Sequence, residues 1–89
     1  MNLITIISPV RYDTVKAGIQ HEVYKELIPV WWARVRLFNP EDDILLVRGP
    51  RRPAMAFKVA GIRVGTGRPD WGAEPIVRYY IFALGVRLK

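Results

Sequence analysis

Side chains alternate between two faces along the last stretch of the chain, Ile76–Leu88. Tyr80, Phe82, Leu84 and Val86 fall on one face of such a strand, because successive side chains of a strand point in opposite directions. A strand of this length is long enough to pair with two neighbours. We therefore expect a sheet in which this segment can pair on both sides.

Four earlier segments are expected to supply the rest of the sheet: Leu3–Ile7, Gln20–Lys25, Ile44–Val47 and Ala54–Val64. The first is a β-branched apolar run, which predicts a buried strand. The last is long, and Gly61 within it predicts a bulge or a sharp bend. Around five strands with glycine at such positions favour a small curved or closed β-barrel.

Two short helices are predicted between these strands. The first spans Pro9–Ala17, since Ser8 can cap its N-terminus and Gly18 is typical of the residue after a helix end. The second is Ile28–Phe38, where Ala33–Leu37 also alternates like a strand. Pro29 near the start and the following Asn39-Pro40 favour the helix. The fold class is thus α+β, mainly β.

The length of the chain predicts one domain over residues 1–89, because 89 residues cannot build a second core. There is no cysteine, which excludes disulfides and thiolate metal sites. No apolar run approaches the roughly 20 residues of a membrane-spanning helix. The start has no signal-peptide pattern either. We expect a cytoplasmic protein with no membrane partner and no cofactor.

The charge balance points to an anionic partner. Fourteen cations oppose eight anions, which gives a net charge of +6, and ten of the cations are arginine. Arginine binds phosphate with two donors at once and stacks on flat rings, so RNA or a nucleotide is the expected partner.

Several aromatic and basic residues are candidates for that contact. Trp31 and Trp32 lie between Lys25 and the pair Arg34 and Arg36, and either stack on bases or pack in the core. Arg48, Arg51 and Arg52 form the densest basic cluster, either a phosphate cradle or a solvated loop. Trp71, in the glycine-rich loop Gly65–Gly72, stacks on a base or closes one end of the barrel.

Catalytic and metal-binding patterns are weaker. His21 is the only histidine, and one neutral ligand beside scattered acids is poor zinc chemistry, so no metal site is expected. The only acid–base set available is Lys16, Glu22, Lys25 and Glu74, which would need to meet in one cleft to act in hydrolysis. Whether the protein is an enzyme stays open.

The order of these motifs resembles ASCH domains, small members of the PUA-like superfamily, and above all the short stand-alone forms of phages and bacteria. The resemblance rests on the following segments, which together span the chain: Lys16-Ala17-Gly18, Glu22–Lys25, Pro29-Val30-Trp31, Asp43-Ile44, Arg48-Gly49, Gly61-Ile62, Gly65 and Trp71-Gly72.

This resemblance implies a β-barrel of five to six strands with an RNA-binding cleft beside the first helix. The cleft would be formed by Lys16, Glu22, Tyr24 and Lys25, with Arg48 and the Trp71 loop at its rim. Some relatives are ribonucleases, and others hydrolyse N4-acetylcytidine with a lysine, a threonine and a glutamate. In the segment 18–22 this chain lacks that lysine and threonine, and Glu74 lies only loosely where the glutamate falls.

The expected function is therefore recognition of single-stranded or modified RNA. The residues expected to bind it are Lys16, Tyr24, Lys25, Arg48, Arg51, Arg52 and Trp71. Two alternatives stay open: a small hydrolase of RNA or modified nucleosides that uses Lys16, Glu22, Lys25 and Glu74, and a phage module that binds a protein. The oligomeric state is not determined by the sequence.

Overall fold

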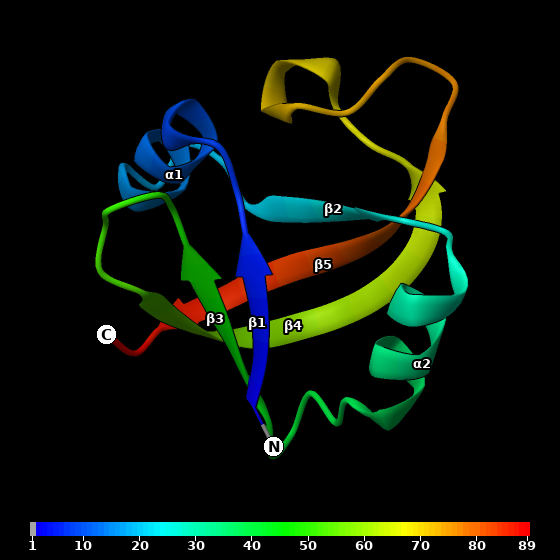
Figure 1. Ribbon diagram of the computed structural model, residues 1–89, viewed down its shortest axis with the longest axis horizontal. Helices are drawn as coiled ribbons and strands as arrows, with labels where there is room; N and C mark the ends of the chain where they lie inside the picture. The colour runs from blue at the N-terminus through cyan, green and yellow to red at the C-terminus, as the bar shows by residue number, and fades with distance from the viewer. Residues whose placement is uncertain (1) are drawn as a thin grey trace.

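A computed structural model describes residues 2–89, and Figure 1 shows the arrangement of its elements. Along the chain these are β1 (Asn2–Ile6), α1 (Pro9–Lys16), β2 (Glu22–Glu26), α2 (Pro29–Leu37), β3 (Ile44–Arg48), β4 (Met55–Thr66), the 3-10 turn η1 (Pro69–Trp71) and β5 (Arg78–Arg87). The α+β class and all the predicted strands and helices are confirmed.

One mixed sheet of five strands, in the order β1-β3-β4-β5-β2, forms the body of the protein. β1 and β3 are parallel, and the other neighbours are antiparallel. As predicted, β5 pairs with two strands, β4 and β2. The register of β4 against β5 shifts between Phe57 and Val59 and again between Val59 and Gly61, which confirms the predicted irregularity at Gly61.

The expectation of a closed barrel is wrong. β4 and β5 curve strongly (Figure 1), but within residues 2–89 β1 and β2 remain edge strands that do not pair with each other. The Lys25 ammonium spans part of this opening and donates a hydrogen bond of 3.4 Å to the Ile6 carbonyl at the end of β1. Within residues 2–89, this side-chain hydrogen bond joins β1 and β2, which form no backbone ladder with each other.

The concave face of the sheet carries the core. This hydrophobic core is built from side chains of the sheet, of α1 and of the residue after α2: Leu3, Tyr12, Val15, Val23, Phe38, Leu45, Val47, Met55, Phe57, Val59 and Phe82. Tyr80 and Leu84 pack against it. β1, predicted as a buried strand, is buried on one face only, because Leu3 and Thr5 are buried while Asn2, Ile4 and Ile6 are exposed. As an edge strand, β1 faces the core with alternate residues only.

The two helices begin and end for local reasons that the sequence shows. At the start of α1 the Ser8 hydroxyl accepts a hydrogen bond from the Arg11 backbone N–H, and Gly18 follows the helix with a φ of +77°. In α2, Pro29 occupies the first turn, but no side chain caps the helix and none of its residues is fully buried. α2 is thus held by a few half-buried side chains, mainly Trp31 and Val35. Neither helix in residues 2–89 is long and apolar enough to cross a membrane.

Candidate functional site

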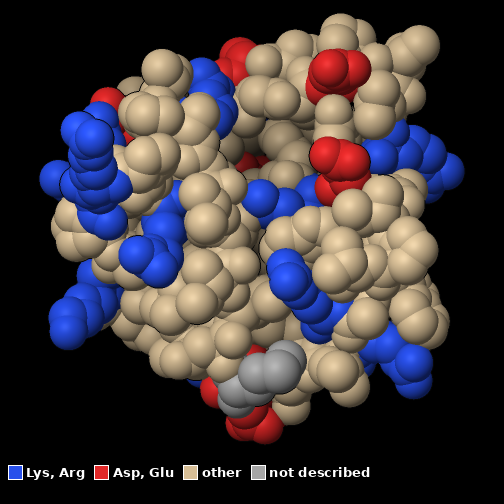
Figure 2. Space-filling view, in the orientation of Figure 1, with Lys and Arg blue, Asp and Glu red and all other residues tan. Residues whose placement is uncertain are grey.

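A small cleft opens at the free edge of β2, between α1 and the loop that contains η1. It has a volume of about 140 Å³. Its lining residues are Ile7, Ser8, Arg11, Gln20, Val23, Tyr24, Trp71 and Gly72. Figure 2 shows the hollow between α1 and the β4–β5 loop on the face turned toward the viewer. We call it the β2 cleft.

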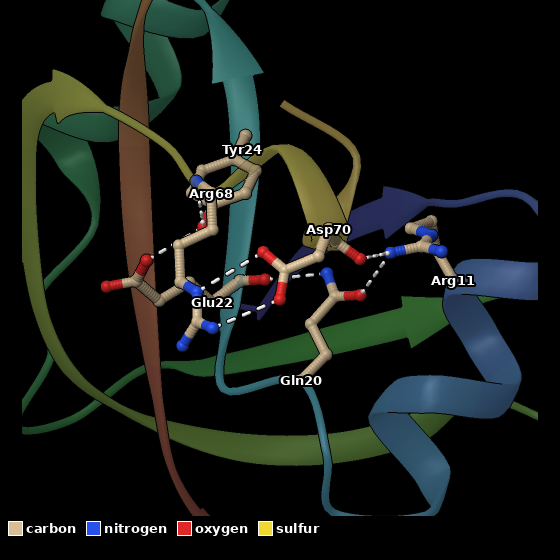
Figure 3. A network of polar contacts seen from close by, with 6 residues as sticks. All are labelled: Arg11, Gln20, Glu22, Tyr24, Arg68 and Asp70. Carbon is tan, nitrogen blue, oxygen red and sulfur yellow. Dashed lines mark hydrogen bonds and ion pairs between the residues drawn. The ribbon is translucent and has the colours of Figure 1, made fainter. Parts of the chain in front are cut away.

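The α1 wall of the β2 cleft is organised by Gln20, a polar side chain that is almost completely buried. Its amide oxygen accepts hydrogen bonds from Thr14 Oγ1 (3.0 Å) and Arg11 Nη1 (3.5 Å), and its Nε2 donates to the Glu22 carbonyl (2.8 Å). Figure 3 shows Gln20 between Arg11 and the start of β2. A buried amide with every group engaged holds its neighbours in fixed positions.

Arg11 joins this wall to the opposite one. Its Nη1 also donates to the backbone carbonyl of Asp70 in η1. A guanidinium has five N–H donors, so Arg11 retains donors for a ligand in the cleft. The backbone of Gly72, at a φ of +98°, passes close to the Arg11 side chain, where an added Cβ would lie 3.1 Å from Arg11 Cδ.

Tyr24 lines the cleft on the β2 side and belongs to a hydrogen-bonded group with Glu22, Arg63 and Arg68. The Tyr24 hydroxyl donates to Glu22 Oε1 (2.8 Å) and accepts from the Arg68 backbone N–H (3.0 Å), while Arg63 donates to Glu22 Oε2 (2.7 Å). Burial works to raise the pKa of Glu22, but the hydrogen bonds from Arg63 and Tyr24 outweigh it and keep that pKa below its usual range. Burial raises the pKa of Tyr24 to about 12, and its hydrogen bond to Glu22 adds to the rise.

Trp71 forms the aromatic wall of the β2 cleft and is half-buried. The Arg68 guanidinium carbon lies 4.1 Å from the centre of its ring, and the His21 ring meets it edge-on at 5.6 Å. Arg68 is in turn paired with Asp70 at 3.0 Å. The indole is therefore held in place on two sides while it still lines an open cavity.

The four acid–base candidates do not meet. Glu22 and Tyr24 lie on one face of β2, whereas Lys25 lies on the other, because neighbouring residues of a strand point in opposite directions. Lys16 is exposed in the last turn of α1, while the cleft lies at its first turn. Glu74 is exposed, and the hydrogen bonds that it makes within residues 2–89 are through its backbone: its N–H donates to the Tyr79 hydroxyl and its carbonyl accepts from the Val77 N–H.

Lys25 is half-buried between the two open edges of the sheet. Its ammonium lies 5.2 Å from the centre of the Trp31 ring as well as near the Ile6 carbonyl. Burial lowers the pKa of this lysine, and the nearby Glu26 offsets only part of the change.

The three arginines of the predicted basic cluster, Arg48, Arg51 and Arg52, lie in different surroundings. Arg48 ends β3, and its carbonyl accepts the Ile7 backbone N–H, which places it next to the β2 cleft. Arg51 is exposed in the loop. Arg52 instead forms a salt bridge with Asp13 of α1 and lies over the Tyr12 ring.

A second hollow, of about 390 Å³, lies between the end of α2 and β4. It is lined by Val35, Phe38, Pro40, Ile62, Arg63, Val64 and Tyr80. Its walls are mostly apolar, and Arg63, the one charged residue among them, is already bound to Glu22. It has no converging polar groups of the kind that orient a ligand.

Arg11, Gln20 and Arg68 are site residues that the sequence reasoning missed. Arg11 lies in the first turn of the predicted first helix, and Arg68 belongs to the glycine-rich loop Gly65–Gly72. Gln20 gave no signal, because nothing in the local sequence shows that its amide is buried. In the described part of the chain, no three histidine or acidic side chains gather in a way that could hold a metal ion.

No protein-family model, curated protein or solved structure matches this chain.

Proposed function

We propose that the protein binds single-stranded RNA, or a nucleotide derived from it, and that one base enters the β2 cleft. The observation that carries this proposal is the position of Trp71, whose ring lines the same cleft as Arg11 and is held by Arg68 and His21. A fixed aromatic ring next to a guanidinium supplies both a stacking surface and a phosphate donor.

The size of the cleft favours one ring over a strand. Its volume of about 140 Å³ is well below the roughly 300 Å³ at which pockets for larger ligands begin. A base in a duplex is stacked on both sides and cannot enter such a space, whereas an unstacked base presents both its face and its edge. Single strands and free nucleotides therefore suit the cleft.

The polar lining fits recognition of a base edge. Ser8, Arg11 and the Tyr24 side chain lie around the opening, and together they offer donors and acceptors. The Arg48 backbone lies next to the cleft through its hydrogen bond with Ile7, which makes its side chain a candidate for a flanking phosphate.

Hydrolysis has less support than binding. Both Glu22 carboxylate oxygens are engaged, by Tyr24 and by Arg63, and its lowered pKa makes it a weak base. Lys25, the other half of an acid–base pair, lies on the opposite face of β2.

Membership of the ASCH class, as a divergent form in which the sheet stays open, belongs to the same proposal. It is supported by the order of elements, with α1 after β1 and the cleft beside α1. A cytoplasmic location, where RNA is available, is also part of it.

The test is the affinity for a short single-stranded RNA, a labelled trinucleotide, followed by fluorescence anisotropy at low and moderate salt. Replacing Trp71 by Ala is expected to weaken binding about 10- to 100-fold, the usual value of one base stacked on an aromatic ring. Trp32→Ala is the matched control, because that ring lies outside the cleft, and it should leave trinucleotide affinity unchanged.

Trp71→Phe guards against a loss of folding, since it keeps an aromatic face and should bind better than Trp71→Ala. Equal affinity of wild type and a folded Trp71→Ala protein would contradict the proposal. So would binding that does not change with salt, because phosphate contacts release counterions. Salt-independent binding to a protein, with none to RNA, would favour the interaction-module alternative.

A further inference from the structure

α2 carries a second group of aromatic and basic side chains, separate from the β2 cleft. Trp31 turns inward and meets the Phe82 ring edge-on at 6.4 Å, with the Arg34 guanidinium 4.9 Å from its own ring centre. Trp32 turns outward, is 53% exposed, and has the Arg36 guanidinium 4.7 Å from its ring centre. We call Trp32, Arg34 and Arg36 the α2 patch.

The arginines of the α2 patch differ from several others in how their charge is balanced. Arg52, Arg63 and Arg68 each form a salt bridge with a carboxylate. Within residues 2–89, Arg34 and Arg36 form no salt bridge and no hydrogen bond through their side chains, and both are exposed. Their positive charge is therefore available to an anionic ligand.

A guanidinium that lies over an indole is already partly ordered. Its position over the ring limits the conformations that it must give up when it binds phosphate, which reduces the entropy cost of binding. Its N–H donors remain at its edge, where they can hold phosphate, and flat guanidinium groups also stack on unpaired bases.

β2 connects the two places along the chain, because Tyr24 of β2 lines the cleft and α2 follows the end of β2. Tyr24 lines the cleft, Lys25 follows it and lies over Trp31, and α2 begins at Pro29. Figure 2 shows lysine and arginine side chains over α2 on the same face as the hollow. One extended ligand can therefore reach both places without passing around the molecule.

RNA suits this surface better than a lipid membrane. α2 exposes Val30 and Leu37 as well as Trp32, but at nine residues it is short of the long apolar face that interfacial helices bury. One exposed ring beside two unpaired arginines is instead the arrangement that binds a base and its phosphates.

We propose that the α2 patch is a second contact for the RNA strand whose base occupies the β2 cleft, with Trp32 stacking on a base and Arg34 and Arg36 binding phosphates. This inference rests on the proposed function. It adds that the protein reads a strand several nucleotides long, and that affinity grows with strand length until α2 is reached.

The experiment compares a trinucleotide with a single strand of about ten nucleotides, a length within the range of sites on other single domains. Trp32→Ala should weaken binding of the longer strand about 5- to 50-fold and leave the trinucleotide unaffected. The double variant Arg34→Gln/Arg36→Gln should lower the slope of log affinity against log salt by about 1.4 for the longer strand, or about 0.7 for each lost phosphate contact. Arg87→Gln is the control, because Arg87 is exposed near the far end of β5 and should have no effect.

The two proposals fail in different ways. Loss of affinity in Trp71→Ala, with the α2 variants equal to wild type on both strands, overturns the inference about α2 and leaves the cleft standing. Loss in the α2 variants on the longer strand, with Trp71→Ala unchanged, overturns the cleft and supports α2 as an RNA surface. Binding to anionic phospholipid vesicles that depends on Trp32, with none to RNA, overturns both.

Discussion

Trp71 and Trp32 each lie beneath an arginine, at 4.1 and 4.7 Å from ring centre to guanidinium carbon, yet their surroundings differ. Around Trp71 the arginine is paired with Asp70 and the backbone is anchored by Tyr24. Around Trp32 nothing in the described residues neutralises the arginine, and the ring projects from a helix with no buried residue.

The comparison shows that one local contact, a cation over an indole, can serve two purposes. In the loop that contains η1, the contact between Arg68 and Trp71 is one of several linked interactions beside the β2 cleft. Removing one of these side chains should therefore lower the stability of the fold. On α2 the cation over the indole is an isolated contact that the fold does not need, so removing it should leave stability intact. The predictions below test this difference from its largest expected effect to its smallest.

Gly67→Ala should be the most damaging change near the cleft. An added Cβ would lie 2.6 Å from Ala73 Cβ and 2.7 Å from Tyr24 Cε1, so the loop must move away from β2. We expect the free energy of unfolding to fall by about 2–3 kcal/mol, as overpacking of a filled site does. Urea denaturation measures it.

Gly61→Ala is the control for Gly67→Ala, because a Cβ at residue 61 would meet nothing within 4 Å. Its cost should stay within about 0.5 kcal/mol. Equal stability of the two variants would mean that the loop does not pack on Tyr24 as described.

Glu22→Gln should have a smaller effect that depends on pH. The folded protein lowers the pKa of Glu22 below its ordinary value of 4.5, so its ionised carboxylate stabilises the fold above that pH. The stabilisation is lost as pH falls through the folded-state pKa. At pH 7 the variant should be less stable by about 1–2 kcal/mol, a value reduced by the exposure of Arg63.

Denaturation at pH 7 and at pH 3 tests this dependence, because the difference between wild type and Glu22→Gln should shrink at the lower pH. Glu74→Gln provides the comparison, since the Glu74 side chain is exposed and makes no hydrogen bond or salt bridge within residues 2–89. A difference that is constant with pH would mean that Glu22 is not held by Arg63 and Tyr24.

Trp32→Ala should have the smallest effect, a change in stability within about 0.5 kcal/mol. Trp31→Ala is the companion variant and should cost more, because Trp31 packs on Phe82. Thermal unfolding of both proteins measures the contrast. A large cost at Trp32 would show that the α2 patch stabilises the fold, and would remove the difference between the two regions.

Local signals in the sequence were enough for most of the elements. Ser8 and Gly18 marked the ends of α1, Pro29 decided between helix and strand in α2, and the alternation in β5 predicted an inner strand. These features act over a few residues, so they can be interpreted without knowledge of the rest of the fold.

The candidate site was only partly predictable, because it depends on contacts between residues that are far apart in the chain. Trp71 was named from its chemistry and Tyr24 from the resemblance to ASCH domains. Gln20 and Arg11 act through partners distant in the chain or hidden from solvent, and no local pattern indicates them. The grouping of Glu22 with Lys25 ignored the alternation along β2 that separates their side chains.

The sequence by itself determined a basic, arginine-rich α+β domain, its strands and helices, and the residue types available for binding an anion. Only the tertiary structure decided whether the sheet closed, because edge pairing depends on how strongly β4 and β5 curve and on Lys25 occupying the gap between β1 and β2. It also decided which arginines are paired with acids and which stay free. Pairing depends on distances between residues far apart in the chain, such as Glu22 and Arg63, and those distances exist only once the chain has folded.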